Sequence, residues 1–276
     1  MNALPNPMVP AAVRVLSTKR ESNDVVTLTL DAAPARHAFR PGQFNMLYAF
    51  GVGEVAISMS GDPADCNVVV HTIRAVGAVT EALCRLEPDD ALGMRGPFGT
   101  PWPMDVAKGS DLLLVAGGLG LAPLRPAVYH ALARRSEYRR VFLLVGARTP
   151  SDLLFPAELE SWRKANDITV LVTVDHATTD WKGRVGVVPA LLADLELRAD
   201  CTIAFVCGPE LMMRFTVREL GRRGLADERI YLSMERSMKC AVGFCGHCQY
   251  RESFICKDGP VLGYDRIRSL FLLREA

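Results

Sequence analysis

The periodicity of the sequence changes near residue 104, and this change constrains the fold more than any other feature. Before it, short segments rich in β-branched and aromatic residues recur between turns that contain Pro and Gly, at 26–30, 43–49, 55–60 and 68–74. Short strands at such regular spacing are typical of an antiparallel barrel or sandwich. We therefore expect residues 1–103 to form an all-β domain, an antiparallel β-barrel.

After residue 104, apolar runs alternate with segments of helical periodicity. The runs expected to form buried strands are 112–116, 141–145, 168–174, 202–206 and 229–232, and the clearest helices are 123–135 and 209–222. Alternating strands and helices predict right-handed crossovers and a doubly wound parallel sheet. We assign residues 104–227 to this α/β domain, and residues 228–276, which have little periodic pattern, to a third, short module.

The C-terminal segment contains a dense group of cysteines. Of the eight in the chain, four fall within seventeen residues, at Cys240, Cys245, Cys248 and Cys256. The first three have the C-x4-C-x2-C spacing of plant-type [2Fe–2S] proteins, with a fourth further along. Structural zinc is the alternative, although it favours two paired C-x2-C knuckles and only one such pair is present.

Composition excludes several classes of protein. Hydrophobic residues make up 49% and charged residues 23% of the chain, which is ordinary for a globular protein. The net charge is +1, so a nucleic-acid partner is not expected. The longest nearly apolar stretch, 112–124, is too short to cross a bilayer, and the first ten residues lack the pattern of a secretory signal. We expect a cytoplasmic protein without a membrane span.

Glycine-rich turns follow two of the predicted strands. The first joins strand 112–116 to its helix and contains Gly117, Gly118, Leu119 and Gly120. Such a turn can present backbone N–H groups to a pyrophosphate, although glycines there are often needed only for packing. The second contains Cys207, Gly208, Pro209 and Glu210 and would line the ligand crevice at the carboxyl edge of the sheet; a plain turn with a buried thiol is the alternative.

A third turn precedes a short helix in the N-terminal domain. It consists of Gly77, Ala78, Val79 and Thr80. The Thr80 hydroxyl suits a helix cap and could also reach a phosphate, so the turn is either a second anion site or an ordinary capped helix.

Barrel, α/β domain and turns together resemble the ferredoxin–NADP reductase superfamily over nearly the whole chain. The family's motifs P-G-Q-[FY], R-G-P-[FY]-G and C-G-P resemble 41–44, 95–99 and 207–209. The segment 57–60 is similar to the flavin-contacting motif R-x-[YF]-[ST], but Val55 and Ile57 replace its Arg and its aromatic residue. Other groups must then hold the flavin phosphate, and an aliphatic side chain must pack on the flavin ring.

The aliphatic variant, joined to a cysteine-rich tail, resembles one branch of the superfamily. That branch contains electron-transfer subunits of dihydroorotate dehydrogenase and of anaerobic sulfite reductase, and gamma subunits of cytosolic NAD(P)-linked [NiFe] hydrogenases. The segment 233–260 is most similar to the hydrogenase gamma subunits. It differs from them at Ala241, where Gly is usual, and at Phe244, where a basic residue is usual.

The resemblance implies FAD in the barrel, NAD(P) across the crevice and a [2Fe–2S] cluster in the tail. The chain would pass electrons between NAD(P)H and the iron–sulfur and catalytic subunits of a multi-subunit enzyme, as a diaphorase-type subunit. Cys207 and Gly208 would line the nicotinamide site, with Pro209 and Glu210 beside them, and Ser58 would hydrogen-bond the flavin. The flavin contacts are expected from Ala56, Ile57, Ser58, Met59, His71, Thr72, Ile73, Gly77, Ala78, Val79 and Thr80. The cluster ligands would be the four grouped cysteines. A zinc-stabilised adaptor with a vestigial crevice is the alternative outside the enzymes.

The choice between NAD and NADP rests on the end of the second predicted strand of the α/β domain. No carboxylate occurs there before Asp152, and Arg148 is placed to pair with a 2′-phosphate. A solvated turn arginine is the alternative, so the sequence favours NADP only slightly.

Overall fold

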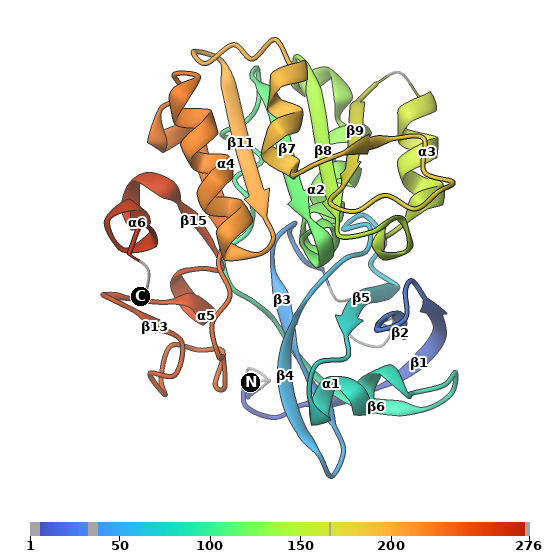
Figure 1. The fold of residues 1–276 in the computed structure, drawn as a ribbon. Helices are drawn as coiled ribbons and strands as arrows, with labels where there is room; N and C mark the ends of the chain where they lie inside the picture. Colours follow the sequence, from blue (N-terminus) through green and yellow to red (C-terminus); the bar gives the residue numbers. More distant parts are fainter. Residues whose placement is uncertain (1–5, 33–37, 166, 274–276) are drawn as a thin grey trace.

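The computed structural model describes residues 6–32, 38–165 and 167–273. It contains two large sheets that face each other across a cleft. Figure 1 shows the parallel sheet and its helices in the upper half, the antiparallel sheet below it and the C-terminal segment at one side. No helix within the described ranges combines the length and the apolar character needed to cross a membrane.

The N-terminal sheet is antiparallel and closes on itself. Its order is β4-β3-β6-β1-β2-β5. The two outer strands are linked by a bridge between Met59 and His71, and the Ser60 N–H donates to the Val70 carbonyl at 2.8 Å. The antiparallel arrangement predicted for this region is confirmed. The elements are β1 (Ala11–Arg20), β2 (Val25–Asp31), β3 (Phe44–Ala49), β4 (Gly53–Ser58), β5 (Val68–Arg74), α1 (Ala78–Cys84) and β6 (Ala91–Phe98).

The second sheet has seven strands in the order β10-β9-β8-β7-β11-β12-β15, all parallel except the last. The chain first builds outward from β7 through β8 and β9 and then returns to place β11 on the other side of β7. This reversal creates a topological switch point between β7 and β11, where open α/β sheets bind ligands. The strands are β7 (Asp111–Gly117), β8 (Val141–Ala147), β9 (Thr169–Val174), β10 (Arg184–Val185), β11 (Thr202–Cys207), β12 (Ile230–Ser233) and β15 (Val261–Gly263).

Helices cover both faces of this sheet, so its central strands are buried throughout. Leu112 and Leu114 of β7 pack with α2 (Leu121–Ala133) and α3 (Pro156–Lys164), whereas Leu113 and Val115 pack with α4 (Glu210–Arg222). Burial on both faces explains why these strands read as unbroken apolar runs. The doubly wound parallel sheet is confirmed, and helix α4 begins one residue later than the predicted range 209–222, with Pro209 as its N-cap. Short 3-10 turns lie at Gly118–Gly120, Arg135–Glu137, Pro150–Asp152, Val188–Asp194 and Asp227–Arg229.

The C-terminal segment is more regular than its sequence suggests. Strand β15 pairs with β12, and α6 (Tyr264–Phe271) buries Tyr264, Ile267 and Phe271 at helical spacing. Cys240, Cys248 and Cys256 lie in one core cluster with β3, β11, β12 and α4. The segment therefore packs against both sheets. Its other elements are β13 (Gln249–Tyr250), β14 (Ser253–Phe254) and α5 (Ile255–Asp258).

Candidate functional site

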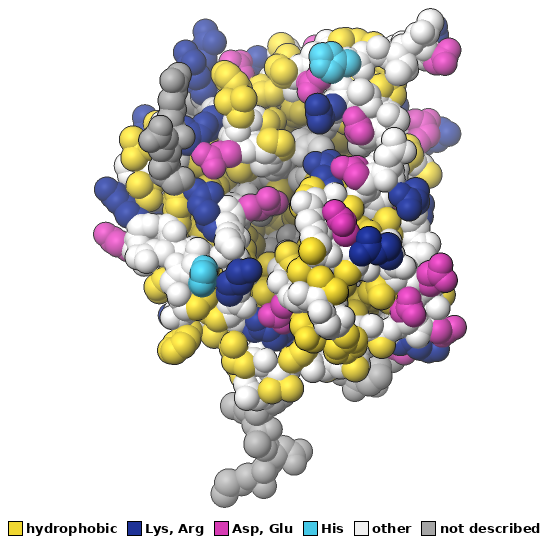
Figure 2. Space-filling view, turned by 60° about the horizontal axis from the view of Figure 1, so that its bottom comes forward, with side chains coloured by type: hydrophobic (Ala, Val, Ile, Leu, Met, Phe, Trp, Pro, Cys, Tyr) yellow, Lys and Arg dark blue, Asp and Glu magenta, His cyan; other side chains and the backbone are white. Residues whose placement is uncertain are grey.

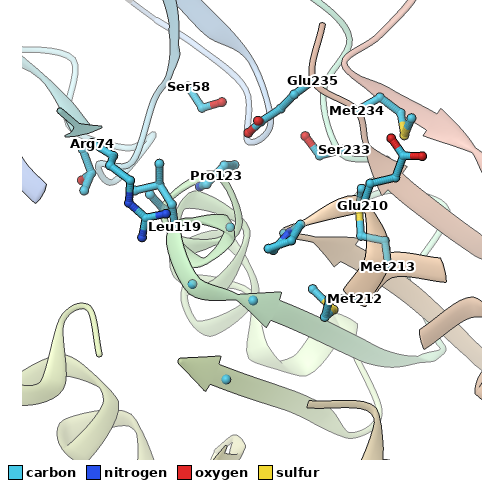
Figure 3. A pocket seen from close by; sticks show the side chains of 18 of the residues that line it. Ser58, Arg74, Leu119, Pro123, Glu210, Met212, Met213, Ser233, Met234 and Glu235 are labelled. Carbon is cyan, nitrogen blue, oxygen red and sulfur yellow. The ribbon is translucent and has the colours of Figure 1, made fainter. Parts of the chain in front are cut away.

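A cleft of about 930 Å³ separates the antiparallel sheet from the carboxyl edge of the parallel sheet. Its walls come from β4, β5, the turn after β7, the turn after β11 and the segment after β12. Figure 2 shows acidic and basic side chains interspersed on the face turned forward from the view of Figure 1, and Figure 3 shows side chains that line the cleft. The volume suits a ligand of dinucleotide size.

Most of the residues predicted for the site line this cleft. They are Ala56, Ile57, Ser58, Thr72, Thr80, Gly117, Gly118, Leu119, Gly120, Arg148, Gly208, Pro209 and Glu210. The structure thus brings together turns that are up to about 150 residues apart in the sequence, as the switch-point rule requires.

Seven predicted residues do not form the wall. Met59, His71 and Ile73 are fully buried in the barrel beneath it. Gly77, Ala78 and Val79 lie at the start of α1, outside the lining. The seventh, Cys207, is 2% exposed behind the turn. His71 supports the wall from below, because its Nδ1 lies 3.0 Å from the Ser58 carbonyl and its Nε2 lies 3.1 Å from the Asn45 amide nitrogen.

The two turns at the switch point are packed directly against each other. A Cβ on Gly120 would collide with the carbonyl oxygen of Cys207, and a Cβ on Gly208 would lie 2.9 Å from the carbonyl oxygen of Gly117. Gly118 and Gly208 also have positive φ angles, +53° and +153°. The packing interpretation of these glycines is confirmed, and the same turns line the cleft, so a pyrophosphate contact at their backbone stays a prediction.

Cys207 backs the cleft without entering it. Burial raises the pKa of its thiol far above the usual range, and the Glu235 charge acts in the same direction, so the sulfur remains a neutral thiol at physiological pH. Cys207 therefore acts as a packing residue of the wall and offers no thiolate for chemistry.

The segment after β12 contributes cleft residues that sequence reasoning missed. Ser233, Met234 and Glu235 line the cleft, and Figure 3 shows the Glu235 carboxyl and the Ser58 hydroxyl projecting into the same space. Loss of solvation around the carboxyl group raises the pKa of Glu235, while the positive charge of Arg74 lowers it. The available signal was topological: β12 is parallel to β11, so the residues after it emerge at the same edge of the sheet.

The cysteine loop, residues 240–256, lies beside this cleft, and backbone N–H groups of the loop point at the cysteine sulfurs. The Phe244 and Cys245 N–H groups donate to the sulfur of Cys240 at 3.2 and 3.4 Å, and the Gly243 N–H donates to that of Cys256 at 3.2 Å. Cys245 is exposed, whereas Cys240, Cys248 and Cys256 are buried.

The environment favours a thiolate at one end of the loop. Burial alone would raise the pKa of Cys240, but the N–H groups aimed at its sulfur bring that pKa to about 6. Burial and the adjacent Cys248 thiol raise the pKa of Cys256 to about 12.

The four grouped thiols suit an iron–sulfur cluster. Over the described part of the chain, no three His, Cys, Asp or Glu side chains converge on one point as ligands of a single metal ion do. The thiols are nevertheless neighbours, Cys240 of Cys245, and Cys256 of both Cys248 and Cys240. Cysteine thiolates are the usual ligands of iron–sulfur clusters, so the donor set fits such a group.

Arg95 joins the cysteine loop to the barrel. Its guanidinium donates to both carboxylate oxygens of Glu54, at 2.7 and 2.6 Å. It also donates to the carbonyls of Cys240 and Lys239, at 2.7 and 2.8 Å. The Arg95 side chain is only 4% exposed, so these contacts fix the first cysteine of the loop against β4 and β6.

Two family models match the chain. Residues 114–218 match the model described as an oxidoreductase NAD-binding domain. Residues 235–268 match the model described as the iron–sulfur cluster binding domain of dihydroorotate dehydrogenase B. The first contains the switch-point turns and the second contains all four grouped cysteines.

Similarity extends over most of the chain. The chain is 37% identical over 242 residues to the sulfhydrogenase 2 gamma subunit of Pyrococcus furiosus, covering 82% of this chain and 83% of the relative. It is also 37% identical over 256 residues to a probable electron-transfer subunit of dihydroorotate dehydrogenase B from Methanothermobacter thermautotrophicus, covering 92% and 88%. A solved structure of an NADH-dependent reduced ferredoxin–NADP oxidoreductase has the same fold, with a TM-score of 0.75, 24% identity and coverage of 100% and 96%. The chain therefore belongs to the ferredoxin–NADP reductase superfamily, in the iron–sulfur branch that includes sulfhydrogenase gamma subunits and dihydroorotate dehydrogenase B electron-transfer subunits.

Proposed function

We propose that the chain is a diaphorase-type subunit that passes electrons between NAD(P)H and a partner catalytic subunit through FAD and a [2Fe–2S] cluster. The expected physiological setting is a cytoplasmic NAD(P)-linked [NiFe] hydrogenase. The proposal combines the family membership with the contents of the cleft and of the cysteine loop.

One observation carries the proposal: the cleft and the cysteine loop share a wall. Phe44 and Ala56 line the cleft on one side and pack on the other against the core cluster that contains Cys240, Cys248 and Cys256. A redox group in the cleft would then be connected to the cysteine loop through side chains, because the Phe44 ring packs on Phe98, and Arg95 lies over Phe98 and donates to the Cys240 carbonyl. Close approach of this kind is what electron transfer between two centres requires.

The residues of the cleft have separate roles in this proposal. FAD, when bound, converts between a hydride, which carries two electrons, and single electrons. The backbone at Gly208 would leave room for the nicotinamide ring, and the hydroxyl of Ser58 would hydrogen-bond the flavin. Glu235 places a carboxyl group near Ser58 (Figure 3), and its pKa is raised above the usual value of a glutamate.

The choice between NAD and NADP would depend on side chains at the far end of the cleft. Arg148 is exposed there at the end of β8 and would pair with a 2′-phosphate. Asp152 lines the same end, but its carboxylate accepts hydrogen bonds from the Thr149 N–H and hydroxyl, at 3.1 and 2.7 Å. Asp175 also lines it and would favour NAD. NADP is therefore the slightly preferred nucleotide.

The cluster assignment is tested on the purified full chain. Iron, sulfide and zinc analysis should give two irons and two sulfides per chain, together with flavin and iron–sulfur absorbance bands. Cys245→Ser should lose most of the iron, whereas Cys66→Ser, which changes another exposed cysteine, should keep it. One zinc per chain and no flavin would support the adaptor alternative instead.

The partner is tested on the complex isolated from native cells. Hydrogen-dependent reduction of NAD(P)+ by that complex would support the hydrogenase setting. The second candidate is a dihydroorotate dehydrogenase, which the match of residues 235–268 favours. Reduction of NAD+ that depends on dihydroorotate and not on hydrogen would select it.

A further inference from the structure

Arg125 of α2 joins the two sides of the cleft from outside it. It lies in the second turn of the helix whose N-cap is Gly120, and its side chain is 12% exposed. Its Nη1 donates to the carbonyl of Ser60 at 3.0 Å, and Ser60 is fully buried just beyond the end of β4. A side chain of the α/β domain therefore binds the backbone of the barrel where the strand that carries Ser58 ends.

The guanidinium of Arg125 is held on the side of the α/β domain. Its Nε and Nη2 donate to the two carboxylate oxygens of Glu158 on α3, the first at 2.8 Å, and the Tyr129 hydroxyl donates to the same carboxylate at 3.0 Å. The guanidinium also lies over the Phe155 ring, 4.1 Å from the ring centre. A bidentate pair and a ring contact restrict its orientation, so Nη1 stays aimed at Ser60.

Phe155 has an unusual backbone conformation. It is the N-cap of α3 with φ +53°, in the left-handed region that a bulky residue rarely adopts, and it is 2% exposed. Such a conformation persists only where the surrounding packing determines it. The Phe155 ring is therefore a fixed platform for the guanidinium of Arg125.

Ser60 connects this contact to the wall formed by β4 and β5, where the flavin is expected (the flavin wall). The Ser60 hydroxyl lies 2.8 Å from the hydroxyl of Thr72. Thr72 and Ser58 both line the cleft, and so does Pro123, which lies in the first turn of the helix that carries Arg125 (Figure 3). Movement of α2 away from Ser60 would therefore change the width of the cleft.

We propose that Arg125 is a positioning residue that sets the spacing between the flavin wall and the switch-point turns. The inference rests on the proposed function, in which a hydride passes with its two electrons from the nicotinamide ring to the flavin ring. That transfer needs the reacting atoms about 3–3.5 Å apart, and a displacement of about 1 Å can slow it about 100-fold.

The place of Arg125 separates rate from binding. Arg125 is not among the described residues that line the cleft, so it contacts neither nucleotide there. Its loss should therefore slow hydride transfer without removing a contact to FAD or to NAD(P).

The test compares variants of Arg125 with a matched surface pair. Arg125→Met keeps the apolar stem and removes every donor. Arg125→Lys can still reach one acceptor, and Glu158→Gln weakens the orienting pair while it leaves the bond to Ser60. Arg163→Met, which removes an exposed arginine paired with Glu160 on α3, is the control.

The first readout is reduction of the bound flavin. The FAD-loaded full chain is mixed with NADH or NADPH by stopped flow, and its affinity for ADP-ribose is measured by calorimetry. Arg125→Met should lower the limiting rate of flavin reduction by about 10- to 100-fold and weaken the charge-transfer absorbance of the nicotinamide–flavin complex. Its affinities for ADP-ribose and FAD should stay within about threefold of the wild-type values. Arg125→Lys and Glu158→Gln should lose less rate, and Arg163→Met should lose none.

The second readout uses the full chain freed of flavin. Amide hydrogen exchange over residues 57–61 should be at least about tenfold faster in Arg125→Met, because the Ser60 carbonyl loses its charged donor and the end of β4 opens more often. Exchange over β1 serves as the internal reference.

Two results would overturn the inference. The first is a wild-type rate of flavin reduction in Arg125→Met or, should that variant not fold, in both Arg125→Lys and Glu158→Gln. The second is a parallel loss of rate and of both affinities, which would mean that the arginine only supports the fold of the site. Failure of NADH and NADPH to reduce the flavin of the wild-type chain would instead contradict the proposed function, and the exchange rates would still decide whether Arg125 holds the end of β4.

Discussion

Replacing Arg95 should release the cysteine loop from the barrel. The buried guanidinium makes two hydrogen bonds to Glu54 and one each to the carbonyls of Pro7, Lys239 and Cys240. Arg95→Met keeps most of the apolar stem but leaves the Glu54 carboxylate, 22% exposed, and these three carbonyls without these donors.

The size of the effect follows from these unpaired groups. Breaking a buried ion pair by removing one partner costs about 3–5 kcal/mol. A hydrogen bond to a charged group contributes about 1.5–3 kcal/mol, but the five bonds share one side chain, so their contributions do not add. We therefore expect Arg95→Met to lower the free energy of unfolding by about 3–5 kcal/mol. Arg95→Lys should lose roughly half of that, because an ammonium group cannot serve all of these acceptors.

The assay combines urea unfolding with the rate of iron release to a chelator at low urea concentration. Iron release should accelerate at least about tenfold in Arg95→Met, the factor that corresponds to about 1.4 kcal/mol of local destabilisation. FAD content should change much less, because neither Arg95 nor Glu54 lines the cleft. Wild-type iron retention together with wild-type stability in Arg95→Met would refute the idea that this arginine anchors the loop.

Three further predictions concern the cysteine loop, the nucleotide and the parallel sheet. Ala241 is buried with φ +65°, so Ala241→Gly should change the free energy of unfolding by less than about 1 kcal/mol, because relief of the left-handed backbone offsets the lost methyl group. Ala241→Val should lower it by about 2 kcal/mol, and equal stability of the two variants would contradict this reasoning. Arg148→Ala should weaken NADPH binding by about 1.5–3 kcal/mol and leave NADH nearly unchanged, as measured by titration; equal losses for both nucleotides would remove the preference for NADP. Burial raises the pKa of Asp111, but hydrogen bonds from Arg140 and Arg198 outweigh it and hold that pKa below its ordinary value of 3.8. The ionised carboxylate therefore stabilises the fold above about pH 4, and this contribution is lost as pH falls through the folded-state pKa. Urea midpoints of wild type and Asp111→Asn should differ at about pH 5 and converge at about pH 2.

The sequence predicted the parts of the fold that have a strong local pattern. The buried strands of the parallel sheet differ from their predicted ranges by at most two residues at either end, and the four cysteines that spacing singled out all lie in the segment 235–268, which matches an iron–sulfur domain model. Strand β15 was missed because three residues carry no periodicity, and its pairing with β12 is set by tertiary packing. Helix α6 was missed although Tyr264, Ile267 and Phe271 have the spacing of a buried helical face.

The orientation of side chains at the strand ends was harder to predict. Cys207 was expected to line the cleft, but every residue of β11 is buried, so its sequence has no alternation from which to infer a direction. Arg74 and Glu235 are ordinary charged residues in the sequence, and only the meeting of β5 with the Gly118 turn and of β12 with β11 brings them into the cleft. Gly208 has a further consequence: a larger residue there would press on the Gly117 backbone, so slower hydride transfer in such a variant would not by itself identify the nicotinamide site.

The pairing of β15 with β12 gives the cysteine-rich segment a second role. Without β15, the backbone donors and acceptors of β12 would form an open sheet edge next to the apolar residues that α6 now covers. Open edges of this kind recruit strands from other molecules, and proteins protect them with short strands and covering helices. A chain cut before residue 261 would therefore be prone to self-association even if its cleft were intact. Swapping this segment between relatives would require matching the edge of the sheet as well as the cysteine ligands.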